Sequence, residues 1–175
     1  MTTTMTNGSN RLAATAFFLL AAMAVVVGAA LGFEHLGGYI PCKLCLEQRM
    51  PYYIGAPLMA VAGLAALMRA PGWIARLLIA AGGLLMVYGL YLAVYHSGVE
   101  WGWWAGPADC GAVAAPPSSE GGILDAINTV IPPSCDKASL RVLGLSFAGW
   151  NAIASLMLAA AALRAAIKGA PDNRG

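Results

Sequence analysis

Four long runs without any charged side chain constrain the fold of this chain more than any other feature. They cover residues 12–33, 50–68, 77–95 and 142–163, and none contains Asp, Glu, Lys, Arg or His. A helix needs about 20 mostly apolar residues to cross the hydrocarbon core of a bilayer, and a lone strand there would leave its backbone polar groups unpaired. The sequence therefore predicts an all-α membrane protein, a four-transmembrane-helix bundle that forms one integral membrane domain over residues 1–175.

The composition excludes the other broad classes of protein. Hydrophobic residues make up 59% of the chain and charged residues 10%, whereas an average soluble domain contains about 25% charged residues. So few charged side chains cannot cover the surface of a soluble globular enzyme of this size, and the high hydrophobic content excludes a disordered chain. The net charge of +2 gives no indication of a nucleic-acid partner, and we expect a lipid bilayer to surround the chain.

The distribution of charges predicts the orientation in the membrane, because Lys and Arg are enriched in cytoplasmic segments. The N-terminal segment, the turn 69–76 and the C-terminal tail together carry six of the ten basic residues and one of the eight acids. The two longer loops, 34–49 and 96–141, carry the other seven acids. We therefore expect both termini in the cytoplasm and both loops on the outer, periplasmic face.

All four cysteines fall in the loops expected outside the cytoplasm, where disulfides persist. Cys42 and Cys45 lie in the first loop, and Cys110 and Cys135 lie in the second. This grouping favours two disulfides, one in each loop, although four cysteines allow three pairings. A disulfide that closes so short a loop as Cys-x-x-Cys removes little chain entropy, and the motif is typical of redox chemistry. Two structural disulfides and a zinc site stay open as alternatives.

The neighbours of Cys45 favour a reactive thiol at the membrane surface. Cys45 precedes the second run by about one turn, where the positive end of a helix favours a thiolate. Arg49 lies at i+4 and shares the face of Cys45 if the helix already includes both residues, and a cation there would stabilise the thiolate. The alternative is that Arg49 anchors the span at the lipid headgroups.

His96 lies at the end of the third run, four residues before Glu100. A histidine in this position can donate a hydrogen bond or carry a proton, but the sequence alone slightly favours a solvated side chain. In the same loop, residues 123–131 carry apolar side chains at helical spacing, which predicts a short amphipathic helix along the membrane surface. Such a helix would bring Cys110 and Cys135 close to Cys42 and Cys45. At the membrane surface, the Cys42–Cys45 pair can be reached by a soluble protein from the water or by a quinone from the bilayer.

The pattern resembles the disulfide bond formation protein B (DsbB) family, the quinone-dependent thiol oxidases of the bacterial inner membrane. The most specific part is Cys-x-x-Cys followed four residues later by Arg at the mouth of a span, with two more cysteines in the next outer loop. The stretches PCKLCLEQRMPYY and YHSGVEWGWW are similar to alphaproteobacterial members. The resemblance extends from about residue 12 to residue 165 and rests on residues 33–35, 41–49, 95–100, 134–135, 143–145 and 150–151 and on Cys110.

The resemblance implies a role for each cysteine. Cys110 matches the cysteine that the thiolate of the partner protein attacks, and Cys135 matches its resolving partner. Cys42 matches the cysteine that exchanges with the loop disulfide. Cys45 matches the thiolate that passes electrons to the quinone.

The resemblance also implies a quinone site at Arg49 and His96, and a surface helix at residues 123–131. The Gly-, Pro- and Ser-rich run 111–122 departs from the better-known members, which affects how a partner would dock. The implied electron acceptor is ubiquinone, with menaquinone as the alternative, and the implied partner is a periplasmic DsbA-like thioredoxin-fold protein. Two other functions stay open: a membrane scaffold or assembly protein with two structural disulfides, and a reductase that runs the same relay in reverse.

Overall fold

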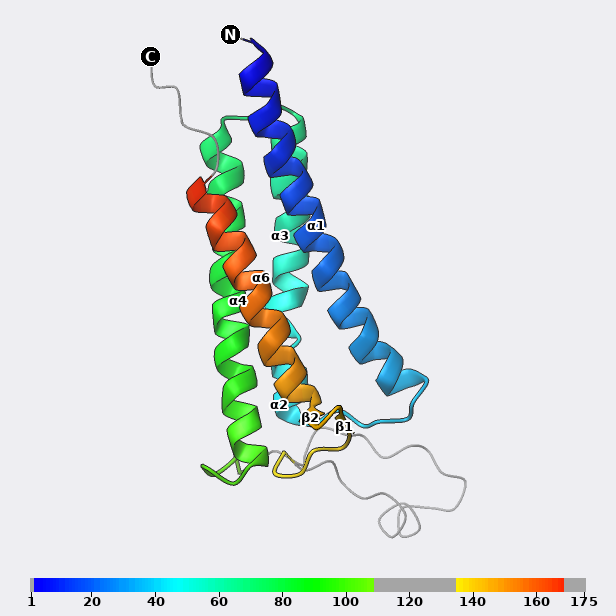
Figure 1. The fold of residues 1–175 in the computed structure, drawn as a ribbon. Coiled ribbons are helices and arrows are strands. Elements are labelled where there is room, and N and C mark those ends of the chain that lie inside the picture. The colour runs from blue at the N-terminus through cyan, green and yellow to red at the C-terminus, as the bar shows by residue number, and fades with distance from the viewer. Residues whose placement is uncertain (1, 109–134, 169–175) are drawn as a thin grey trace.

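Four long helices make up most of the chain, and the computed structural model describes residues 2–108 and 135–168 (Figure 1). A short helix precedes the second long helix, and a two-stranded hairpin precedes the last. In chain order the elements are α1 (Thr2–His35), α2 (Lys43–Glu47), α3 (Met50–Leu67), α4 (Gly72–Glu100), β1 (Arg141–Val142), β2 (Leu145–Ser146) and α6 (Phe147–Lys168).

The long helices have the length and the surface of membrane spans. Each of the four is long and apolar enough to cross a bilayer. Large apolar side chains such as Phe18, Leu64 and Leu77 point outward and are more than half exposed. An apolar surface of this extent is solvated by lipid rather than by water. The predicted four-transmembrane-helix bundle is therefore confirmed.

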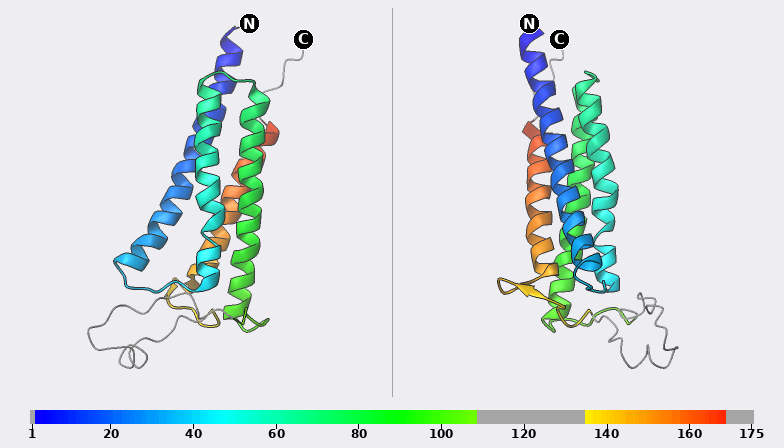
Figure 2. Two further views of the ribbon diagram at one scale, coloured as in Figure 1. Left: turned by 180° about the vertical axis from the view of Figure 1, so that it is seen from behind. Right: turned by 90° about the vertical axis from the view of Figure 1, so that its right-hand side faces the viewer.

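The helices are arranged so that α4 packs against α3 and α6, while α1 packs mainly against α3 (Figures 1 and 2). The start of α1, the end of α6 and the α3–α4 connection lie at one end of the bundle. The short helix α2 and the hairpin lie at the other end, where α1 diverges from the other helices (Figure 2). The bundle is therefore widest at the end that holds Cys42 and Cys45.

Small residues let α4 and α6 approach closely. A Cβ atom at Gly83 would lie 3.0 Å from the side chain of Leu163 and 3.2 Å from the Cβ of Ala162, so this contact favours a glycine, as is common between helices in lipid. Near the same end, the Arg76 Nε donates a hydrogen bond of 2.8 Å to the carbonyl of Ala166. That bond satisfies one of the carbonyls left unpaired at the C-terminus of α6.

The break between α2 and α3 has a local cause. Pro51 has no N–H group, so the carbonyl of Glu47 loses the partner that a continuous helix would give it. Accordingly α2 ends at Glu47, α3 begins at Met50, and Gln48 and Arg49 lie between them with helical backbone angles.

The last span begins later than the uncharged run 142–163 predicts. Residues 141–146 form an antiparallel hairpin in which Val142 pairs with Leu145. Leu143 and Gly144 both have positive φ angles, 53° and 85°, as the type I′ form of a two-residue hairpin turn requires. Because the hairpin contains the first residues of the uncharged run, α6 begins only at Phe147.

The third span is longer than the run 77–95 predicts, since α4 extends from Gly72 to Glu100. His96 therefore lies in the last turns of a helix rather than in a loop. The expected amphipathic helix at 123–131 lies outside the described residues.

Candidate active site

Cys42 and Cys45 lie at the start of α2 with their sulfur atoms 2.7 Å apart. Cys42 caps this helix: its backbone is extended, and its sulfur accepts a hydrogen bond of 3.3 Å from the Cys45 N–H. Both are free thiols, so the structure holds this pair in its reduced form rather than as the expected disulfide. The contact between the two sulfurs keeps them in position for the bond to close.

The two thiols of the pair are not equivalent. The pKa of the Cys42 thiol lies far above its usual range, first because its S–H donates a hydrogen bond to Cys45, and then because the thiol is buried next to it. Cys42 therefore keeps its proton when the pair ionises, and Cys45 becomes the thiolate. The thiolate is the nucleophilic form of a cysteine, so the pair has a defined reactive end.

Cys135 brings the second loop to the same place. Its side chain is buried and packs in one cluster with Cys42, Leu44 and Val99. Cys135 is disulfide-bonded, while Cys110 lies outside the described residues. The sulfurs of Cys42 and Cys135 and a ring nitrogen of His96 all lie within 4.8 Å of one another. A disulfide sulfur is not available as a zinc ligand, so this proximity favours sulfur exchange over metal binding.

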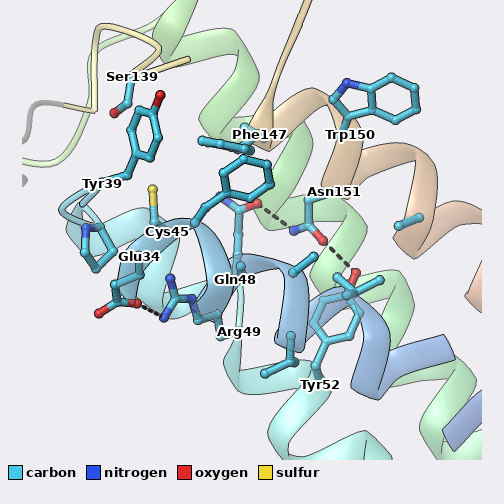
Figure 3. A pocket seen from close by; sticks show the side chains of 18 of the residues that line it. Glu34, Tyr39, Cys45, Gln48, Arg49, Tyr52, Ser139, Phe147, Trp150 and Asn151 are labelled. Carbon is cyan, nitrogen blue, oxygen red and sulfur yellow. Dashed lines mark hydrogen bonds and ion pairs between the residues drawn. The ribbon is translucent and has the colours of Figure 1, made fainter. Parts of the chain in front are cut away.

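A cavity of about 450 Å³ opens beside the thiol pair. It lies between the outer parts of α1 and α6, where the two helices diverge (Figure 2). Most of its wall is apolar, with side chains such as Val26, Phe33 and Phe147. Its polar wall comes from Glu34, Cys45, Gln48, Arg49, Tyr52, His96, Ser139 and Asn151, most of which Figure 3 shows.

Arg49 lines this cavity but is held by a partner that the sequence did not indicate. Its Nη1 donates a hydrogen bond of 2.5 Å to the Glu34 Oε2 (Figure 3). The side chains are 12% and 25% exposed, respectively, so the ion pair is partly shielded from solvent. Glu34 comes from the end of α1 and fixes the guanidinium at the wall of the cavity.

His96 is buried, with only 4% of its side chain exposed, so the expectation of a solvated histidine is wrong. Its Nδ1 lies 2.6 Å from the Gln48 Nε2. Its Nε2 lies 3.7 Å from the Cys42 sulfur and 3.8 Å from the Glu100 Oε1. The other carboxylate oxygen of Glu100 is buried and has no hydrogen-bond partner among the described residues. His96 thus contacts the thiol pair directly.

Four uncharged polar residues in or next to the site were not identified as site residues from the sequence. The Gln48 Oε1 accepts a hydrogen bond from the Asn151 Nδ2 at 2.6 Å, and the Asn151 Oδ1 accepts one from the Tyr52 hydroxyl at 2.6 Å. Tyr52 in turn lies 2.9 Å from the Ser155 hydroxyl. These residues are uncharged and lie in or beside the apolar runs. The absence of charged residues, which identified the spans, therefore does not distinguish them from the rest of a span.

The fold and the arrangement of cysteines define a class: a membrane protein with several spans that is built for thiol–disulfide chemistry. In agreement, residues 11–165 match the family described as disulfide bond formation protein DsbB. The chain belongs to this family, which confirms the resemblance seen in the sequence. Neither a curated protein nor a solved structure matched the chain.

Proposed function

We propose that this protein is a quinone-dependent thiol oxidase that restores the disulfide of a soluble, DsbA-like thioredoxin-fold protein. The observation that supports this most is the position of Cys42. Its sulfur lies 2.7 Å from that of Cys45 and within 4.8 Å of that of Cys135, and Cys45 lines the cavity between α1 and α6. Electrons from the second loop therefore have a short path through sulfur atoms to a cavity in the bilayer.

The first half of the relay moves two electrons from the partner into the Cys42–Cys45 pair. Each exchange needs a thiolate that attacks a disulfide sulfur. The partner's thiolate attacks Cys110, and Cys135 leaves as a thiolate. Cys135 then attacks the closed Cys42–Cys45 disulfide at Cys42, and Cys45 leaves as a thiolate at the cavity.

The second half resets the loop and releases the partner. The partner's second thiolate attacks the sulfur that is bonded to Cys110, which completes the partner's disulfide and frees Cys110. Cys110 attacks Cys135, restores the loop disulfide and releases Cys42. Cys42 and Cys45 now hold both electrons as thiols. Closing their disulfide releases two electrons and two protons, and a quinone bound beside Cys45 would supply the acceptor for both.

The residues around the cavity fit a quinone. Its wall is mostly apolar, as a ring with an isoprenoid tail requires, and its volume of about 450 Å³ lies in the range of small-molecule sites. Arg49 supplies a charged donor for a carbonyl oxygen on which negative charge develops, and Cys45 is the thiol at the same wall. We propose ubiquinone as the acceptor, with menaquinone as the alternative.

We also propose that the cysteines face the periplasm of a bacterial inner membrane and that both termini are cytoplasmic. The start of α1, the α3–α4 connection and the start of α4 lie at the end of the bundle opposite to α2 (Figure 1), and these segments carry Arg11, Arg69 and Arg76, respectively. That arrangement agrees with the enrichment of Lys and Arg on the cytoplasmic side.

The experiment combines the purified protein with a reduced DsbA-like protein and follows the absorbance of ubiquinone or menaquinone. The wild-type protein should reduce the quinone, Cys45→Ser should abolish the reaction, and Arg11→Ala, at the far end of the bundle, should leave it unchanged. No quinone reduction by the wild type, or full activity in Cys45→Ser, would refute the proposal. Oxidation of quinol with reduction of the partner's disulfide would instead identify a reductase.

A further inference from the structure

A continuous chain of side-chain hydrogen bonds leads from the middle of the bundle to Cys42. It passes from α6 to α3, back to α6, to the turn before α3, and then to α4 (Figure 3 shows its central part). In order, it joins Ser155, Tyr52, Asn151, Gln48, His96 and Cys42. Every link lies at 2.6–2.9 Å except the last, an N···S contact of 3.7 Å.

The two amides give this chain a direction. An amide nitrogen only donates and an amide oxygen only accepts. The Gln48 oxygen is occupied by the Asn151 Nδ2, so the nitrogen of Gln48 faces the Nδ1 of His96. The Asn151 oxygen is occupied by the Tyr52 hydroxyl, so Tyr52 in turn accepts from Ser155. All donors therefore point toward the thiol pair.

This direction determines which nitrogen of His96 carries the proton. Because Gln48 donates to Nδ1, that nitrogen must hold a lone pair, and the proton of the neutral ring sits on Nε2. The Nε2 proton faces the Cys42 sulfur at 3.7 Å and the Glu100 Oε1 at 3.8 Å. His96 is thereby prepared as a hydrogen-bond donor to the sulfur rather than as a base that removes its proton.

We propose that Gln48 is a positioning residue that holds His96 in the Nε2–H tautomer, so that His96 stabilises negative charge on the Cys42 sulfur. The need for such a donor rests on the proposed function, because the relay requires a thiolate at Cys42. Cys42 must leave as a thiolate when the loop disulfide reforms, and its burial next to Cys45 makes that thiolate costly. A hydrogen-bond donor held in a fixed position lowers the free-energy cost of the thiolate at Cys42. A cation near the pair, Arg49, is bonded to Glu34 and lines the cavity instead.

The first test reads the tautomer directly by NMR of protein with isotope-labelled histidine ring nitrogens. The chain has only two histidines, and His35, which is exposed, serves as an internal control. In the wild type, His96 should carry its proton on Nε2. Gln48→Glu keeps the shape of the side chain but offers two acceptor oxygens, so His96 should then be protonated on Nδ1, while His35 does not change. A wild-type proton on Nδ1, or an unchanged tautomer in Gln48→Glu, would overturn the proposal.

The second test measures the thiolate of Cys42 in a protein whose other three cysteines are replaced by Ala. Loss of a hydrogen bond to a charged group changes an equilibrium by about 10- to 100-fold. His96→Leu should therefore slow the alkylation of Cys42 at neutral pH by about that factor and move its pH midpoint upward. Gln48→Met should give a smaller shift, and His35→Leu should give none.

An alkylation profile that is the same with and without His96 would refute the role at Cys42. Neither test requires quinone or a partner protein. A failed quinone assay with the expected tautomer and alkylation shifts would therefore count against the proposed function alone.

Discussion

The ion pair between Arg49 and Glu34 allows a sharp test of how the cavity is organised. Glu34 Oε2 accepts the Arg49 Nη1 at 2.5 Å, across the gap between α1 and the start of α3. A long arginine side chain otherwise samples many rotamers, and holding one of them costs entropy on binding. We therefore expect Glu34 to contribute to quinone use by fixing Arg49, with no contact of its own to the reacting atoms.

The magnitude follows from the geometry of the pair. Ordering a rotamer-rich side chain on binding costs about 0.5–1.5 kcal/mol, and we take the upper end because the Arg49 side chain is long, only 12% exposed, and held by Glu34 at its charged end. Since about 1.4 kcal/mol corresponds to a factor of ten, Glu34→Ala should raise the KM for quinone about tenfold. The assay is steady-state quinone reduction at a saturating concentration of the reduced partner.

A double-mutant cycle decides whether the effect passes through the arginine. In an Arg49→Ala background, Glu34→Ala should change the KM no further, because the group that it positions is already gone. Glu47→Ala is the matched control, since this carboxylate lies on α2 but does not line the cavity. The reasoning fails if Glu34→Ala raises the KM equally in both backgrounds, or if it leaves the KM of the wild type unchanged.

Two further predictions concern the buried polar chain and the thiol pair. Tyr52→Phe leaves the Asn151 oxygen without its donor and should lower the free energy of unfolding by about 1–3 kcal/mol, measured by SDS-induced unfolding in detergent micelles. Tyr53→Phe, on the exposed side of the same helix, should change it by much less. Because the pKa of Cys42 is raised, less of Cys42 than of Cys45 is present as thiolate at any given pH. One equivalent of iodoacetamide near pH 8 should therefore label Cys45 first, as read by mass spectrometry. Equal labelling of the two cysteines would contradict the assignment of Cys45 as the reactive thiol.

The number and position of the spans could be predicted from the sequence because the bilayer imposes a simple rule. Uncharged runs long enough to cross it must be helical, and the four runs match the four long helices. The ends of the helices are set by local backbone chemistry instead. The hairpin at 141–146 depends on two consecutive residues with positive φ, Leu143 and Gly144, and one of them is a leucine, a residue type that rarely adopts this conformation. Hydropathy alone therefore extends the last span through the hairpin.

The polar interior of the bundle was harder to predict because most of its members are uncharged, yet the spacing of polar residues in the sequence indicates it. Gln48 and Tyr52 are four residues apart, as are Asn151 and Ser155, and as are His96 and Glu100. Residues at i and i+4 share one face of a helix, and a polar residue inside a membrane faces the bundle rather than the lipid. Three helices that each carry one such pair near the same end must turn these faces toward one another. The spacing thus predicts a buried polar cluster beside the cysteines, although it cannot assign the order of donors and acceptors, which depends on how the helices pack.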